Sequence, residues 1–71
     1  MIRFSAKYLD GIWRTSNYTI PSKEAEQEYA NELVELFQHF MAKGYILGYT
    51  VEIVYTVGNE EFIDIKKSEE L

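Results

Sequence analysis

The chain has 71 residues, a net charge of −5, no cysteine, and a composition that is 46% hydrophobic and 15% aromatic. Such a composition is too apolar for a disordered chain and supplies one modest core, so we expect a single domain over residues 1–71. The lack of cysteine excludes a disulfide framework, a thiolate nucleophile and a cysteine-rich zinc site. The acidic balance argues against direct binding of nucleic acid, because phosphate-backbone binding takes its affinity from clustered Lys and Arg.

The apolar segments of the chain are too short for a membrane. No apolar run approaches the roughly 20 residues that span a bilayer, and the N-terminal region lacks the continuous apolar stretch of a signal peptide. We therefore expect no membrane contact and a cytoplasmic location. Charge is spread unevenly. Residues 1–23 carry four basic and one acidic side chain (+3), whereas residues 24–71 carry three basic and eleven acidic side chains (−8).

The N-terminal region has the pattern of a β-hairpin. Residues 2–8 alternate apolar and polar side chains with the period of a strand buried on one face, and residues 12–20 are rich in strand formers after an Asp-Gly turn signal. A two-residue turn would leave Phe4 opposite a polar residue, whereas a register shifted by one sets Phe4 against Tyr18. We predict the shifted register, with a three-residue loop or a bulge near Gly11.

An amphipathic helix is expected next. Ser22 is a good N-cap, because its hydroxyl can accept a hydrogen bond from a free backbone N–H at the helix start. Apolar side chains then recur at helical spacing over about half of the helical wheel. They are Ala25, Tyr29, Leu33, Leu36, Phe37 and Phe40. Gly44 is placed to end the helix in the left-handed conformation.

A second hairpin follows the helix. Residues 45–57 have apolar side chains at every odd position, which predicts a long strand, and a turn is expected at Gly58. One register sets Ile53 against Ile65, and the register one residue away sets Ile53 against Asp64. We predict the first, which requires a loop of odd length or a bulge.

The predicted order of elements is ββαββ, an α+β fold. One amphipathic helix packed on one face of a four-stranded, mainly antiparallel sheet is the simplest way to bury the three apolar stripes. The two hairpins could join through either edge, and the sequence does not choose between them. Residues 67–71 form a charged tail that we expect to fray.

Few groups in the chain could carry out chemistry. His39 is the single histidine, and Glu35 lies one helical turn before it, at the spacing of a general-base pair. No nucleophile accompanies the pair at a recognisable spacing, so we interpret His39 as a surface residue. Residues 59–61 could hold a hard cation only loosely, and no glycine-rich loop precedes a helix to bind phosphate. We therefore predict that the chain is not an enzyme and has no catalytic residue, metal or cofactor.

The expected helix carries a row of glutamates on one face. Four side chains fall within about 80° of one another on the helical wheel. They are Glu24, Glu28, Glu32 and Glu35. None of them has a Lys or Arg three or four residues toward the C-terminus, and like charges at that spacing destabilise a helix slightly. The row is either a solubilising surface or a docking surface for a protein partner with a basic surface. In the second case the glutamates would mimic a row of nucleic-acid phosphates.

Aromatic residues suggest a second surface. In the predicted register Trp13 points to the sheet face opposite the helix, near Arg3 and Lys7. An exposed Trp beside Arg is typical of an interface anchor, and the alternative is that Trp13 covers the end of the core through a bulge. Val54 and Phe62, expected on the same outer face, would widen the patch and could drive formation of a homodimer.

In size, acidity, absence of cysteine and absence of catalytic groups, the chain resembles the small inhibitors that phages and mobile elements make against host enzymes, including the anti-CRISPR proteins. The likeness is one of composition and supplies no site residues. It implies a small inhibitory binder, and our leading hypothesis is that the four glutamates occupy a basic groove of a nucleic-acid-handling enzyme and block it. The alternative is a homo-oligomeric structural or regulatory module that associates through its sheet face or edge strands. A third hypothesis, binding of single-stranded nucleic acid around Trp13, has few positive charges to support it.

Overall fold

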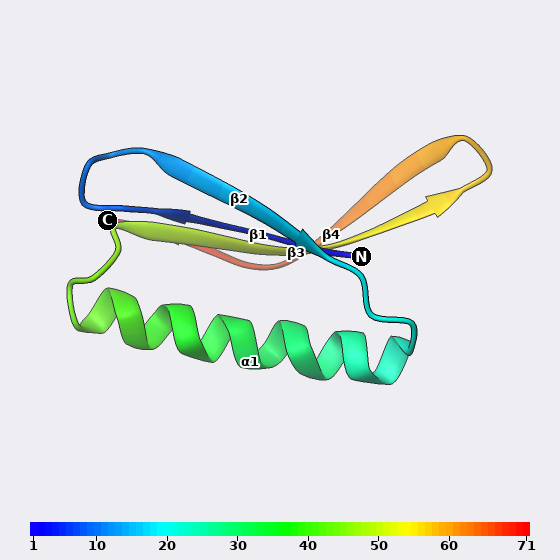
Figure 1. The fold of residues 1–71 in the computed structure, drawn as a ribbon, viewed down its shortest axis with the longest axis horizontal. Coiled ribbons are helices and arrows are strands. Elements are labelled where there is room, and N and C mark those ends of the chain that lie inside the picture. The colour runs from blue at the N-terminus through cyan, green and yellow to red at the C-terminus, as the bar shows by residue number, and fades with distance from the viewer.

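Five elements make up the computed structural model, which describes residues 1–71. They are β1 (Ile2–Lys7), β2 (Trp13–Tyr18), α1 (Lys23–Ala42), β3 (Gly48–Val57) and β4 (Glu60–Glu70). The strands form one antiparallel sheet in the order β2-β1-β3-β4, and α1 lies along one face of it (Figure 1). This arrangement confirms the predicted α+β fold class and shows that the two hairpins join through β1 and β3.

The core lies between α1 and the two central strands. Alternate side chains of β1 and β3 face the helix, as the period of two predicts. Nine buried residues form one cluster: Ile2, Ala6, Ala30, Leu33, Phe37, Ile46, Tyr49, Val51 and Ile53. Burying a large apolar side chain contributes about 1.5–3 kcal/mol, so this cluster holds α1 against the sheet.

Local signals set both ends of α1. The Ser22 hydroxyl accepts a hydrogen bond from the backbone N–H of Ala25 at 3.3 Å, as expected of the N-cap. At the other end, Gly44 has φ +76° and its N–H donates to Met41, while the N–H of Tyr45 donates to Phe40. These two hydrogen bonds form a Schellman motif, which confirms the role predicted for Gly44.

The first hairpin has the predicted loop length but a different register. Tyr8 pairs with Ile12 across a three-residue loop that ends at Gly11, and Phe4 lies opposite Ser16 instead of Tyr18. The prediction was wrong because it matched apolar side chains across β1 and β2, whereas all six residues of β2 are exposed, so that matching gains little burial.

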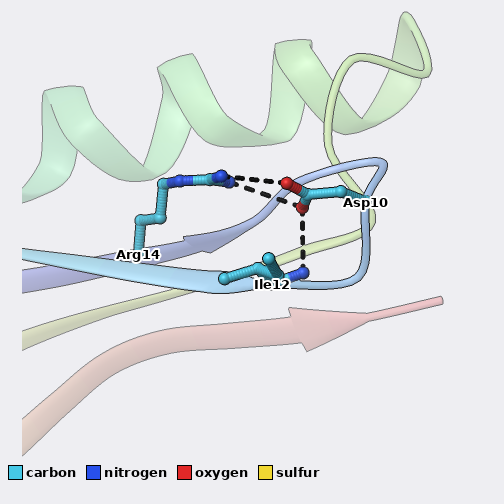
Figure 2. A network of polar contacts seen from close by, with 3 residues as sticks. All are labelled: Asp10, Ile12 and Arg14. Carbon is cyan, nitrogen blue, oxygen red and sulfur yellow. Dashed lines mark hydrogen bonds and ion pairs between the residues drawn. The ribbon is translucent and has the colours of Figure 1, made fainter.

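A carboxylate orders the first loop. Asp10 accepts a hydrogen bond from the backbone N–H of Ile12 at 3.0 Å and forms an ion pair with Arg14 at 2.9 Å (Figure 2). These contacts, with the Arg14 hydrogen bond as the larger cause, lower the pKa of Asp10, and the same pair raises the pKa of Arg14. Asp10, held by Ile12 and Arg14, therefore orders the loop that sets the register of β2.

The second hairpin also departs from the predicted register. Near the turn Ile53 lies opposite Asp64, not Ile65, because the loop has only two residues and begins at Gly58 with φ +64°. The expected bulge is present, but it lies within the strand pair, where Lys66 is the extra residue. One consequence is that Phe62 lies on the helix side of the sheet and Ile65 on the outer side, the reverse of the prediction.

Beyond β1, the second hairpin continues alone. β1 pairs with β3 only as far as Ile53, so residues 54–65 project as a two-stranded ribbon away from α1 (Figure 1). We call residues 54–65 the distal hairpin. The radius of gyration is 12.7 Å, against about 11 Å expected for a compact domain of this length. The projection makes the molecule elongated, with extents of 39 × 22 × 15 Å.

The end of the chain is ordered by the sheet. Residues 67–70, predicted to fray, continue β4 beyond the bulge. The hydroxyl of Tyr49 donates to Glu69 at 2.5 Å, and Lys7 forms an ion pair with Glu70 at 3.4 Å. Burial and this hydrogen bond raise the pKa of Tyr49 to about 12. The bulge shifts the register of β4 by one residue, and this shift brings Glu69 and Glu70 beside Tyr49 and Lys7. The charged sequence of residues 67–71 gave no sign of these contacts.

Candidate partner-binding surfaces

The four predicted glutamates lie on the side of α1 that faces away from the sheet. Each side chain is exposed, and none takes part in an ion pair of the structure. We call Glu24, Glu28, Glu32 and Glu35 the acidic helix face. Because no basic side chain neutralises it, its negative potential is directed outward toward solvent.

The acidic helix face is held on a rigid support. Ala30, Leu33 and Phe37 anchor the opposite side of α1 in the core, and both helix ends are capped. Glu35 comes eleven positions after Glu24, which corresponds to about 16 Å along the helix axis. The charges are therefore presented in a nearly straight line. His39 is exposed farther along the same helix, and no three His, Asp or Glu side chains converge to hold a metal ion.

Trp13 lies on the opposite side of the molecule. It pairs with Lys7, whose side chain is on the sheet face away from α1, and its ring reaches within 3.2 Å of the space that a Cβ on Gly48 would fill. The side chain remains 40% exposed. Trp13 therefore covers the bare backbone at Gly48 while leaving part of its ring accessible. The acidic helix face and Trp13 therefore belong to two separate surfaces, and one flat partner surface cannot contact both.

The basic residues near Trp13 already have partners. Arg3 donates to Asn17 at 3.3 Å and lies 3.6 Å from Glu61, and Lys7 pairs with Glu70. The same face also has two pairs of hydrogen-bonded hydroxyl groups: those of Ser5 and Thr15 are 2.8 Å apart, and those of Thr50 and Ser68 are 3.0 Å apart. This outer face is nearly neutral, so Arg3 and Lys7 are less able to bind a phosphate backbone than the sequence pattern indicated.

The distal hairpin exposes large apolar side chains on both of its faces. On the helix side Tyr55 and Phe62 stack with ring centroids 5.8 Å apart and remain 51% and 41% exposed. On the outer side Ile63 and Ile65 are 50% and 60% exposed, whereas Val54 is buried. Sequence reasoning missed Ile63 and Ile65 as surface residues because it placed them in the wrong register. A two-residue Gly-Asn turn was the signal that could have revealed them.

A shallow groove separates the distal hairpin from the first turns of α1. Its volume is about 410 Å³. Its walls are formed by Lys23, Glu26, Gln27, Ile53, Tyr55, Thr56, Val57 and Asp64. Beside the groove, two polar contacts join α1 to other parts of the sheet: Lys66 of β4 donates to Gln27 at 2.9 Å, and the amino group of Met1 lies 2.8 Å from Glu26. The groove has both apolar and charged walls, which suits a side chain of a partner protein better than a nucleic-acid backbone.

No protein-family model, curated protein or solved structure matches this chain. None of its helices is long and apolar enough to cross a membrane. Arguments about function therefore depend on the surfaces described above, which are the acidic helix face, the outer face around Trp13 and the distal hairpin.

Proposed function

We propose that the protein is a non-enzymatic binding module whose acidic helix face occupies a basic groove on a nucleic-acid-handling enzyme and blocks it. The observation that carries this proposal is the row of four exposed glutamates with no intramolecular partner. Like charges one turn apart cost a helix a few tenths of a kcal/mol per pair. A row that costs stability and gains no contact within the chain is best explained by a contact outside it.

The geometry of the row supports mimicry of a phosphate backbone. The four charges are spaced about 5.5 Å apart on average along the helix axis, against about 3.4 Å per phosphate along one DNA strand. The row is thus a sparser version of the charge line that a nucleic-acid-binding groove recognises. Electrostatic complementarity of this kind speeds association and makes binding sensitive to salt.

The compositional likeness to the small inhibitors of phages and mobile elements supports the same class. Such a protein, like the anti-CRISPR group, would work in the cytoplasm, where nucleic-acid enzymes are found. Trp13 lies too far around the molecule to share the groove with the acidic helix face, so we assign the primary contact to the four glutamates alone. Trp13 becomes a candidate for a separate contact.

Two quadruple variants test the proposal. The first changes Glu24, Glu28, Glu32 and Glu35 to glutamine, and the second changes the same residues to aspartate. Partners captured from host lysate by the unmodified protein would be identified by mass spectrometry, and the purified partner would be titrated with each variant. We expect the glutamine variant to lose binding and the aspartate variant to keep most of it, because only the first removes the charges. Equal binding by all three proteins at low salt would contradict the proposal.

A further inference from the structure

The distal hairpin lacks the cover that the central strands β1 and proximal β3 have. α1 and β1 cover the proximal part of β3, whereas the distal hairpin leaves Tyr55, Val57, Phe62, Ile63 and Ile65 between 41% and 63% exposed. A two-stranded ribbon is marginally stable in water, and an open strand edge with apolar neighbours favours pairing with another strand. The hairpin therefore has the features of an interface without a partner.

From these features we infer that the protein forms a symmetric homodimer in which the β4 strands of two copies pair antiparallel along residues 60–66. β4 is the edge strand of the sheet over its whole length. The open edge of β3 is a poorer candidate, because it spans only four residues and the N–H of Val54 is already bonded to Met1 at 2.8 Å. The dimer would continue the sheet across a two-fold axis from four strands to eight.

The order of charges along β4 identifies the second copy as the occupant. Glu60, Glu61 and Asp64 come first, and Lys66 and Lys67 follow. Parallel pairing in register would set like charges side by side. Antiparallel pairing about Ile63 sets Glu60 opposite Lys66 of the partner subunit and Ile63 opposite Ile63 of the partner subunit. The strand is therefore complementary to itself in one direction only, and each dimer contains the charged pair twice.

The two members of the charged pair lie on the same side of the sheet, as this pairing requires. Glu60 pairs with Val57 on the helix side, and Lys66 is held on that side by its hydrogen bond to Gln27. Ile63 and Ile65 lie together on the outer side, where Ile63 of one copy would also lie diagonally across from Ile65 of the partner subunit. The helix side of the proposed interface thus carries the matched charges, and the outer side carries the apolar contact.

The two helices would not collide. A two-fold axis perpendicular to the sheet places both α1 helices on the same side, and three strand spacings separate the two β3 strands, or about 14 Å. Packed helices need only about 8–10 Å between their axes. The dimer would also present both acidic helix faces in the same direction, but the pairing of β4 does not depend on what those faces bind.

A charge swap tests the dimer and its register together. Mass would be measured by sedimentation equilibrium from low micromolar to millimolar concentration for the unmodified protein, Glu60→Lys, Lys66→Glu and the double variant that carries both changes. We expect a mass twice the 8.4 kDa of one chain, a dissociation constant raised about tenfold or more by each single change, and recovery in the double variant. Circular dichroism checks that every variant is folded.

Two matched controls separate the β4 edge from other surfaces. Glu28→Lys changes the same charge on the acidic helix face, and Thr56→Lys adds a charge to β3 of the same hairpin on its outer side, away from Glu60 and Lys66. Both should leave the dissociation constant unchanged. A strict monomer over the whole range, a double variant that stays as weak as the single variants, or a dimer dispersed by Trp13→Ala but not by the β4 changes would overturn the inference. None of these measurements involves the proposed enzyme partner, so their failure would leave the proposed function standing.

Discussion

The packed body of the protein and the distal hairpin share one pattern of alternating apolar side chains but have different environments. In the body, apolar residues of β1, proximal β3 and α1, together with Ile46 between α1 and β3, form one buried cluster of nine side chains. In the distal hairpin the same β3 alternation continues through Tyr55 and Val57, yet these side chains are exposed because the pairing with β1 ends at Ile53 and the hairpin bends away from α1 (Figure 1). Alternation therefore predicts which face a side chain occupies, and only the extent of the neighbouring elements decides whether that face is buried.

The largest expected contrast comes from removing one phenylalanine ring in each region. Phe37 packs against Phe4 and Tyr49 with ring centroids 6.1 and 5.6 Å away, and Phe37→Ala should lower the free energy of unfolding by about 3–5 kcal/mol. Phe62→Ala, the matched change in the distal hairpin, should cost about 1 kcal/mol or less, since that ring is partly exposed already. Chemical denaturation measures both values. Equal losses would show that the hairpin is part of the cooperative core.

A glycine at the edge of the body gives an intermediate effect. A Cβ on Gly48 would lie 3.0 Å from the backbone oxygen of Glu69 and 3.2 Å from the ring of Trp13. We expect Gly48→Ala to lower the free energy of unfolding by about 1–3 kcal/mol, because the β4 backbone cannot move aside cheaply. Adding Trp13→Ala should not relieve the strain with β4. Thermal unfolding of the single and double variants measures these losses. If Gly48→Ala leaves the stability unchanged, the strands separate more easily than the packing suggests.

The tyrosine that ties β4 to the core should make stability depend on alkaline pH. The folded protein holds the Tyr49 proton up to a pKa of about 12, against 10.0 for the ordinary side chain. A group whose pKa is raised on folding contributes stability below its unfolded pKa, so that contribution is lost as pH rises from about 10 toward 12. Tyr49→Phe should cost about 0.5–1.5 kcal/mol at neutral pH and flatten this alkaline decline. Denaturant unfolding across that range provides the measurement, and an unchanged decline in Tyr49→Phe would assign it to other groups.

The smallest expected effect is a gain in stability. Changing the four glutamates of the acidic helix face to glutamine removes like-charge neighbours one turn apart on α1. We expect the free energy of unfolding to rise by a few tenths of a kcal/mol per pair at low salt, and the gain to disappear at high salt. Denaturation at both ionic strengths tests this. A loss of stability would mean that the glutamates make contacts within the chain and would weaken the argument that they are reserved for a partner.

Helix boundaries were predictable because their signals are local. Ser22 and Gly44 act through hydrogen bonds to residues within one turn, and the spacing of the apolar side chains also defines the face on which the four glutamates lie. The α+β class follows from the same patterns. These features need no knowledge of distant elements.

Strand registers were not predictable in the same way. Phe4 was expected opposite Tyr18 because apolar pairs were assumed to be buried together. However, α1 touches β2 only where Tyr29 stacks on Tyr18, with ring centroids 5.3 Å apart, and all six β2 residues stay exposed. In the second hairpin the two-residue turn at Gly58 determines the register, and the bulge at Lys66 then compensates within the strand. Errors of one residue reversed the face assigned to Phe62. The exposed apolar surface of the distal hairpin could therefore be identified only from the structure, whereas the acidic helix face could be predicted from the sequence.

Competition with nucleic acid is the most direct test of the proposed binding mode. The captured enzyme would be loaded with a fluorescent oligonucleotide that it binds, and fluorescence anisotropy would follow its release as the protein is added. If the acidic helix face occupies the nucleic-acid groove, the unmodified protein will displace the oligonucleotide and the four-glutamine variant will not. If the enzyme binds the protein and the oligonucleotide at the same time, with no change in affinity for either, the acidic helix face is not a substitute for phosphate and the proposed function is wrong.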